Sequence, residues 1–209
     1  DSDTIFELSI TPNRPDALSH LGIARELVGV TGVDLPSYRA LPFVKSDSRI
    51  LLEDTAACPH YVAVLIEGVK IAPSPLWLQN RLKAIGLRPI NNVVDITNYV
   101  LHSVGQPLHA FDLDQLLEQR IRVRTDIRGE FVTLDGKTRL IEPGVIMICD
   151  AQRPVAIGGI MGGLHSEISD QTTNVLLESA YFNPSHIRRA SKKLGLSTDA
   201  SYRFERGVD

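Results

Sequence analysis

The sequence predicts an α+β fold with a layered, β-sandwich-like core of mixed strands flanked by helices. Strand-like segments outnumber helical ones, and the two types do not alternate regularly, as they would in a doubly wound parallel sheet. A chain of 209 residues can bury a substantial core as one large domain or two small ones. We expect residues 1–48 to form a lead-in strand, helix and linker, and residues 49–209 to form the main domain.

The composition excludes several classes of protein. The net charge of -3 gives no support for strong nonspecific nucleic-acid binding, so an RNA contact must come from a local patch. Cys58 and Cys149 are the only cysteines and lack zinc-ligand spacing, so we expect neither a disulfide framework nor a metal site. Without a signal peptide or a long apolar run, we expect a cytoplasmic protein with no membrane contact. The abrupt ends suggest a piece of a larger protein.

The predicted lead-in begins with a strand. Alternating residues at 6–10 indicate this strand, and a proline-rich turn follows it. Asp16 is the predicted N-cap of a helix that runs to about Val30 and stops at Gly32. The helix has one apolar stripe, formed by Leu18, Leu21, Leu27 and Val28. Prolines and polar residues at 33–48 predict a linker.

The next segments are strands, helices and one loop. Residues 61–66 predict a buried strand, and Pro75 suits the first position of a helix that ends at Gly86. Residues 91–103 permit strand or helix, and we favour a short strand or turn followed by a helix. Residues 105–112, GQPLHAFD, predict a shaped loop because they contain glycine and proline.

Three further strands are predicted after this loop. Residues 121–124 alternate like a half-exposed strand. Asp135 and Gly136 suit the type I′ turn of a hairpin at 131–138, and residues 145–149 predict a buried strand.

A helix from Asn183 to about Leu194, closed by Gly195, holds the densest basic cluster of the chain. The cluster consists of Arg188, Arg189, Lys192 and Lys193. Such a face is usually only solvated, and a tRNA backbone contact is the second interpretation. A loop of small residues at 197–201 follows the helix and offers hydroxyl groups to a pocket.

The stretch from Val155 to Phe182 is the most informative for function. Its glycines between 158 and 163 leave backbone amides accessible to a ligand. The strand that follows places Leu176, Glu178 and Ala180 on one face. A carboxylate among apolar neighbours costs free energy unless it has a partner or a ligand. The alternative is a surface strand whose glutamate faces water.

His109 also has two interpretations. It is either a core histidine hydrogen-bonded to the backbone or a histidine at a pocket wall that exchanges a proton near neutral pH. The chain contains no GxxxxGK[ST] loop and no GxSxG elbow, and its glycine run lacks the Rossmann spacing. Neither a nucleotide site nor a covalent nucleophile is therefore indicated.

Five motifs in this order resemble the beta subunit of bacterial phenylalanyl-tRNA synthetase, in its central editing region, the B-three/B-four or tRNA-binding domain. The motifs are TPNRPD at 11–16, VDITNY at 94–99, GQPLHAFD at 105–112, GIMGG at 159–163 and TDASYRFERGVD at 198–209. The resemblance covers essentially the whole chain. One departure is Ala17, where many relatives carry cysteine.

The resemblance implies hydrolysis of misacylated tyrosyl-tRNA(Phe), with no cofactor in this region. The parent would be an alpha2-beta2 enzyme that joins phenylalanine to tRNA(Phe) with ATP and magnesium, with the synthetic active site in the alpha subunit. Glu178 would accept a hydrogen bond from the tyrosine phenol, and His109 would orient or deprotonate water, with help from the terminal ribose hydroxyl. The other implied substrate-binding positions are Gly159 and Gly162 through their backbone amides, Thr198, Ala200, and Arg88 at the edge.

The pocket is expected between the glycine segment at 158–163, the strand of Glu178 and the loop of His109. A non-catalytic tRNA-binding or subunit-assembly module is the alternative function. A domain that only buttresses the alpha subunit is another, and an exposed apolar patch on the helix at 16–30 would favour it. A free-standing deacylase is the third.

Overall fold

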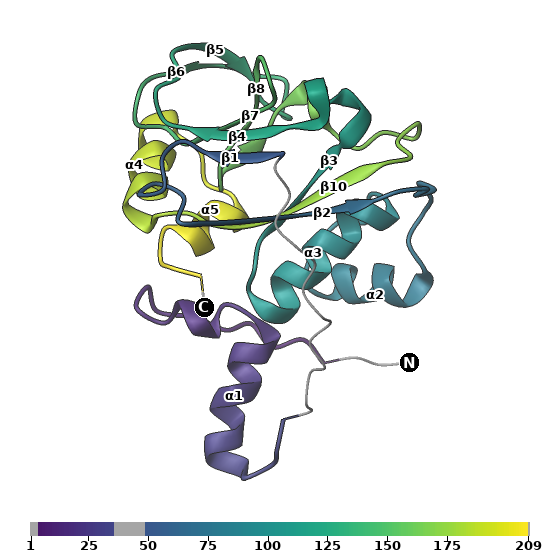
Figure 1. Cartoon of the computed structure of the whole chain (residues 1–209). Coiled ribbons are helices and arrows are strands. Elements are labelled where there is room, and N and C mark those ends of the chain that lie inside the picture. Colours follow the sequence, from purple (N-terminus) through teal and green to yellow (C-terminus); the bar gives the residue numbers. More distant parts are fainter. Residues whose placement is uncertain (1–3, 36–48, 209) are drawn as a thin grey trace.

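The computed structural model describes residues 4–35 and 49–208 and places two β-sheets face to face (Figure 1). The larger sheet has the order β1-β4-β7-β8-β9, and β1 is parallel to β4 while the other neighbours are antiparallel. Its strands are β1 (Ile50–Leu52), β4 (Ile121–Arg124), β7 (Met147–Cys149), β8 (Pro154–Ile157) and β9 (Met161–Gly162). The predicted strands at 121–124 and 145–149 are confirmed.

The second sheet has the order β2-β10-β3, and all its pairs are antiparallel. It consists of β2 (His60–Ile66), β10 (Val175–Tyr181) and β3 (Leu108–Asp112). The prediction of a loop at 105–112 is wrong from Leu108 onward, because β3 pairs with a strand far along the chain. Strand β2 exists but is an edge strand rather than a buried one, and its Val64 is 51% exposed.

A hairpin of β5 (Gly129–Val132) and β6 (Thr138–Ile141) lies against the larger sheet, as the Asp135-Gly136 turn predicts. Gly136 has φ 73°, but Asp135 has no positive φ, so the hairpin is confirmed while its turn is not of type I′. Short 3-10 helices fill the connections, at Leu113–Gln115, Leu117–Gln119 and Leu164–Ser166.

Helices α2 (Leu76–Ala84) and α3 (Asn92–Val104) lie beneath the three-stranded sheet in Figure 1. The prediction of a strand or turn before the second helix is wrong, because 92–104 is one continuous helix. The Asn91 side chain accepts hydrogen bonds from the amides of Val93 and Val94 at 3.1 and 2.9 Å, which satisfies the first turn. Gly105, with φ 86°, ends the helix.

Helices α4 (Pro184–Leu194) and α5 (Asp199–Phe204) lie beside the sandwich. The Asn183 cap and the Gly195 stop of α4 are confirmed. The prediction of a loop at 197–201 is wrong, because Thr198 and Ser201 form a capping box that starts α5.

The N-terminal part projects below the two sheets. Residues 6–10 are almost wholly exposed and form no strand, so that prediction is wrong. A 3-10 turn, Pro15–Ala17, precedes α1 (His20–Thr31), whose N-cap is Ser19 rather than Asp16. The Asp16 carboxylate instead accepts hydrogen bonds from Arg14. Gly32 ends α1 as predicted.

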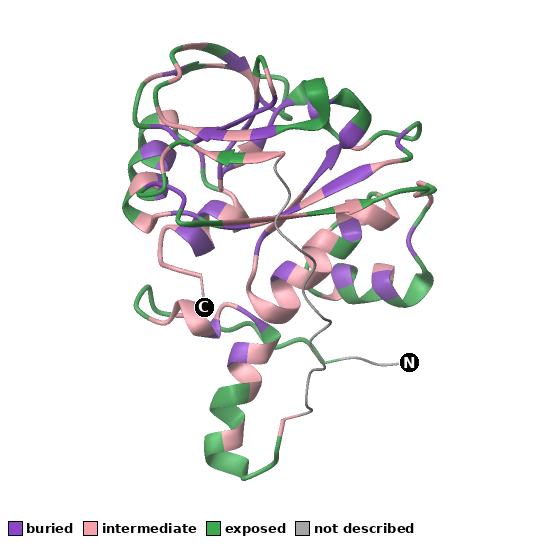
Figure 2. Ribbon diagram, in the orientation of Figure 1, coloured by how far each residue is buried: buried purple, intermediate pink, exposed green. Residues whose placement is uncertain are grey.

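The predicted linker at 33–48 falls mostly on residues 36–48, which lie outside the described residues. The division into 1–48 and 49–209 therefore stays a prediction. The core of the described chain lies between the two sheets, where the ribbon of Figure 2 is coloured as buried. Among its fully buried side chains are Phe111, Phe182, Ile121, Ile148, Leu176 and Ile187. These layered mixed sheets with flanking helices confirm the α+β fold class.

Candidate functional site

A cavity of about 260 Å³ opens beside the core-facing side of β3 and β10. Most of the predicted site residues line it together: His109, Gly159, Gly162, Glu178, Thr198 and Ala200. The glycine segment, the Glu178 strand and the His109 segment meet here, as predicted. Arg88 lies exposed in the loop after α2 and does not line the cavity, so its predicted place at the edge gains no support.

Glu178 is a buried carboxyl group, only 6% exposed, on the same face of β10 as Leu176 and Ala180. The interpretation of a glutamate facing water is therefore wrong. The Tyr61 phenol donates a hydrogen bond of 2.6 Å to its Oε2 atom. Burial raises the pKa of Glu178 to about 7, and the bond from Tyr61 acts in the opposite direction. Near neutral pH this group exists in both protonation states.

His109 lies directly opposite Glu178 in the register of β3 and β10, so both side chains lie on one face of the sheet. Its ring packs edge-on against Phe111 with 4.4 Å between centroids. Within the described chain the ring makes no hydrogen bond, which argues against the core histidine bonded to the backbone. Burial lowers the pKa of His109 to about 4, so the imidazole is neutral at physiological pH.

The two predicted glycines permit close packing around the cavity. A Cβ atom on Gly162 would lie 2.7 Å from Cε1 of His109, so only glycine leaves the ring its place. Gly159 has φ 68°, and a Cβ there would lie 2.8 Å from Phe182 and 2.9 Å from Ile187 in the core. Both positions therefore require glycine for steric reasons in addition to any contact of their amides with a ligand.

Thr198 joins α5 to the glycine segment. Its hydroxyl donates to the carbonyl of Ile160 at 2.9 Å and accepts from the amide of Ser201 at 3.0 Å. Because the hydroxyl serves both elements, Thr198 fixes one wall of the cavity. Ala200 lines the cavity from the first turn of α5.

Sequence reasoning missed several lining residues and one supporting residue. Thr97 and Asn98 reach the cavity from α3, and Leu134 reaches it from the β5–β6 turn. Asn98 falls inside the motif at 94–99, so the signal was present. Tyr61 and Ala63 lie on the same, core-facing side of β2. The period of the strand indicates this side, but it does not indicate the hydrogen bond of Tyr61 to Glu178.

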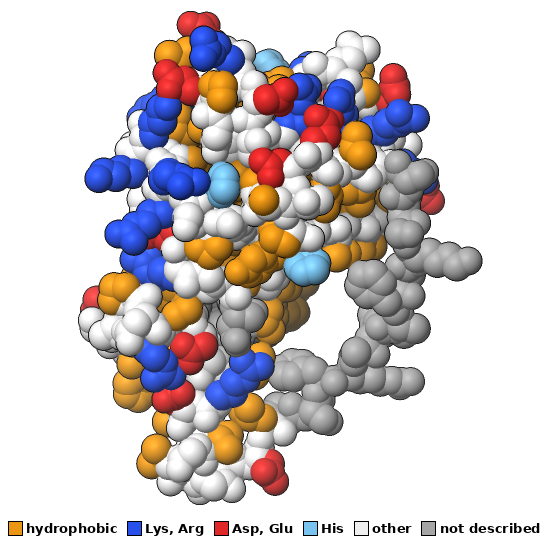
Figure 3. Space-filling model, turned by 60° about the vertical axis from the view of Figure 1, so that its left-hand side comes forward, with side chains coloured by type: hydrophobic (Ala, Val, Ile, Leu, Met, Phe, Trp, Pro, Cys, Tyr) orange, Lys and Arg blue, Asp and Glu red, His pale blue; other side chains and the backbone are white. Residues whose placement is uncertain are grey.

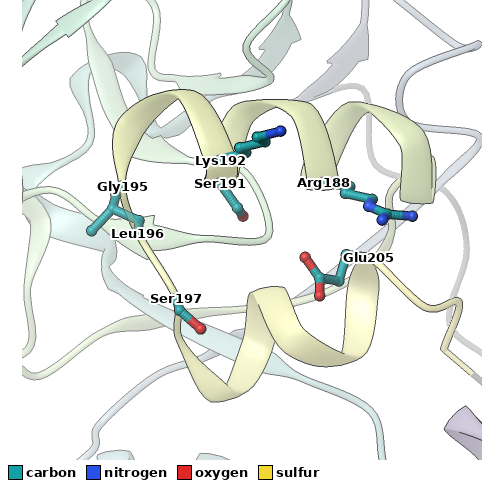
Figure 4. A pocket seen from close by; sticks show the side chains of 7 residues that line it. All are labelled: Arg188, Ser191, Lys192, Gly195, Leu196, Ser197 and Glu205. Carbon is teal, nitrogen blue, oxygen red and sulfur yellow. The ribbon is translucent and has the colours of Figure 1, made fainter. Parts of the chain in front are cut away.

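A second hollow, of about 290 Å³, lies between α4 and α5 and contains no predicted site residue (Figure 4). Arg188 and Lys192 of α4 and Glu205 on the facing side line it. Lys and Arg side chains gather on the left of the face in Figure 3. Lys193 pairs with Glu142, whereas Arg188 and Lys192 are exposed, which agrees with a solvated basic face.

No helix among residues 4–35 and 49–208 is long and apolar enough to cross a membrane. The same residues include no group of three or more His, Cys, Asp or Glu side chains placed to hold a metal ion.

The profile of the B3/4 domain family matches residues 57–209. The phenylalanine–tRNA ligase beta subunit of Chlorobaculum tepidum is 54% identical over the whole chain, and that of Salinibacter ruber is 53% identical. The chain spans about a quarter of these relatives, 26% of each. An N-terminal fragment of the beta subunit from Pyrococcus horikoshii aligns over 90% of this chain and 60% of its own, with TM-score 0.47 and 15% identity. The chain belongs to the B3/4 domain family, in the form found in phenylalanine–tRNA ligase beta subunits.

Proposed function

We propose that this chain is an editing domain, which hydrolyses the ester bond of tyrosyl-tRNA(Phe) that has been formed in error. It would do so within a ligase that joins phenylalanine to tRNA(Phe). The observation that carries the proposal is the buried carboxyl group of Glu178 in a cavity wall. This group already accepts a short hydrogen bond from a phenol, that of Tyr61. It therefore has the chemistry to accept a second phenol from a tyrosyl substrate.

Such a second site solves a problem of recognition. A hydrophobic pocket rejects an analogue with one extra hydroxyl only weakly, by about a hundredfold. A site built around a buried acceptor selects in the other direction, because phenylalanine leaves that acceptor unpaired. Discrimination by this means reaches about ten-thousandfold. Glu178 would thus admit the wrong amino acid for removal and leave the correct one attached.

The hydrolytic step needs an oriented water. The water oxygen attacks the ester carbonyl, the bond to the ribose oxygen breaks, and the ribose hydroxyl leaves with a proton. A neutral His109 can hold this water through its free nitrogen, but a pKa of about 4 makes it a weak general base. The neighbouring ribose hydroxyl is a second group that could share the proton transfer. Backbone amides of the glycine segment would help to hold the substrate.

The partners are part of the proposal, and the chain's membership of the family supports them. As part of a phenylalanine–tRNA ligase beta subunit, this chain would work with tRNA(Phe) and an alpha subunit in an alpha2-beta2 enzyme in the cytoplasm. ATP and magnesium would serve the synthetic reaction in the alpha subunit. We assign no cofactor to the hydrolytic site, and no step of the proposed hydrolysis uses one.

The test is deacylation of tyrosyl-tRNA(Phe) and phenylalanyl-tRNA(Phe) by the intact parent enzyme. We expect the wild type to clear the tyrosyl ester much faster and Glu178→Ala to lose about 10- to 100-fold of this preference, since a hydrogen bond to a charged group is lost. The matched control is Glu130→Ala, which removes an exposed carboxylate of β5 and should retain the preference. If the wild type and both variants hydrolyse tyrosyl-tRNA(Phe) no faster than the uncatalysed reaction, the editing function is rejected.

A subunit-assembly role is the second candidate, and the exposed apolar residues of α1 favour it. Leu27 and Val30 are 55% and 86% exposed on this projecting helix. If α1 packs against another part of the enzyme, Leu27→Ser with Val30→Ser should weaken assembly with the alpha subunit and leave the cavity unchanged. Unaltered assembly of the double variant in gel filtration would reject this role.

A further inference from the structure

Tyr61 is placed to act on Glu178 from outside the cavity. In the β2–β10 register Tyr61 pairs with Ala180 and Ala63 pairs with Glu178, so Tyr61 and Glu178 are diagonal neighbours on one sheet face. The phenol approaches Oε2 of the carboxyl group at 2.6 Å. Tyr61 itself does not line the cavity, whereas Glu178 does.

The bond from Tyr61 occupies one of the two carboxyl oxygens of Glu178 and leaves the other available. Oε2 accepts the proton of Tyr61, and Oε1 accepts no hydrogen bond from any described residue. A carboxylate offers about four lone-pair sites, so one occupied oxygen leaves the other available. The bond also fixes the rotation of the carboxyl group, because one oxygen is held against the sheet.

We propose that Tyr61 is a specificity-determining positioning residue, whose hydroxyl holds the Glu178 carboxyl group turned so that its free oxygen receives the phenol of a tyrosyl ester. The inference rests on the proposed editing function and deepens it. Tyr61 need not touch the substrate, because it acts through Glu178. It is a second phenol on the same carboxylate, supplied by the protein.

The charge balance around Glu178 supports this assignment. Burial raises the pKa of Glu178 and the Tyr61 bond lowers it, so loss of the hydroxyl should raise the pKa further. Tyr61 remains a donor throughout, because burial and the adjacent carboxylate hold its own pKa well above the usual range. His109 faces Glu178 from the other neighbouring strand and is uncharged near pH 7, so it contributes no compensating charge.

The experiment uses the full ligase and compares kcat/KM for the tyrosyl and phenylalanyl esters between pH 5.5 and 8.5. The ratio of the two esters cancels alkaline hydrolysis and ionisation of the shared α-amino group. In the wild type the ratio should rise with pH through about 7, as Glu178 ionises and becomes the better acceptor. Tyr61→Phe should lower the ratio at pH 7 about tenfold, mainly through KM for the tyrosyl ester, and move the midpoint to higher pH.

Tyr181→Phe is the matched control, because it makes the same change at an exposed end of β10 and should keep the wild-type ratio and midpoint. Glu178→Gln supplies a second check. This variant has no ionising group at the site, so its ratio should not vary with pH, and Tyr61→Phe added to it should move no midpoint.

Two results overturn the proposal. If Tyr61→Phe slows both esters equally without a shift in midpoint, the tyrosine only supports the sheet. If the wild type prefers the tyrosyl ester and Glu178→Ala abolishes that preference, but Tyr61→Phe matches the wild type, the Tyr61 assignment fails while the editing function stands. A wild type without tyrosyl preference would instead remove the editing function itself.

Discussion

At the scale of single residues, burial shifts the pKa values of the two central groups of the cavity in opposite directions: it raises that of Glu178 and lowers that of His109. Glu178 and His109 face each other across β10 and β3, yet burial favours the neutral form of each. His109 is therefore uncharged at neutral pH, whereas Glu178 titrates there. Near pH 7 this part of the wall therefore changes charge at Glu178 alone, the group that would receive the hydroxyl of the ligand.

Replacement of His109 by alanine tests the catalytic assignment. We expect His109→Ala to slow hydrolysis of tyrosyl-tRNA(Phe) by about a hundredfold, because the group that orients the water is lost. Binding of a nonhydrolysable tyrosyl-adenosine analogue should persist, since Glu178 still accepts the phenol. Single-turnover deacylation and equilibrium binding measure the two effects. His165→Ala, at an exposed position, is the control, and full activity of His109→Ala would reject the catalytic role.

The roles of single residues were predictable only in part. The period of a strand put Glu178 on one face with Leu176 and Ala180, and left open whether that face is buried; the structure confirms the shared face and shows that it is buried. Its partner Tyr61 lies 117 residues away in the chain, and a hydrogen bond over that distance leaves no local pattern. Arg88 was carried over by resemblance alone, and the structure leaves it outside the cavity wall.

At the scale of elements, the glycine segment sets how closely β9 approaches β3. Gly162→Ala places a methyl group 2.7 Å from Cε1 of His109 and 2.9 Å from Cδ1 of Leu134. Since the ring must move, we expect deacylation to fall at least about tenfold and the free energy of unfolding to fall by about 1–3 kcal/mol. Deacylation rates and denaturant unfolding give the two values.

Gly29→Ala is the control for this substitution. Gly29 lies inside α1 with no atom near a new Cβ, so alanine should stabilise the helix by about 1 kcal/mol and leave deacylation unchanged. Wild-type deacylation by Gly162→Ala would show that the position of the ring does not depend on this glycine.

Element prediction succeeded where the signals are local. Asn183 caps the start of α4 and Gly195 ends it, and Asp135 and Gly136 lie in the hairpin turn. It failed where distant pairing decides. Leu108 to Asp112 is a strand because β10 lies beside it, whereas residues 6–10 alternate but pair with no strand of the described chain. The β-branched residues of α3 suggested a strand, whereas the Asn91 cap favours a helix.

At the scale of the whole molecule, the two shifted groups make the stability depend on pH in opposing ways. Glu178 has a raised pKa, so its contribution is complete below pH 4.5 and is lost as pH rises through about 7. His109 has a lowered pKa, so its contribution is present above pH 6.5 and is lost as pH falls through about 4. In the wild type the two trends partly cancel.

Glu178→Gln should expose the histidine trend. Relative to the wild type, the variant should gain stability as pH rises from 4.5 to 7, by about 3 kcal/mol in total, because it lacks the buried group that must ionise. Chemical unfolding of both proteins at several pH values in this interval measures the difference. A difference that stays constant with pH would contradict the raised pKa of Glu178.

The strand order of the smaller sheet has a consequence for synthesis on the ribosome. Strand β10 lies between β2 and β3, but it is made last of the three. At about 5–20 residues per second, the two outer strands wait several seconds without their shared neighbour. Tyr61 and His109 are thus translated well before Glu178 arrives between them. A nascent chain that stalls before β10 would present two unpaired strands to chaperones and to other nascent chains.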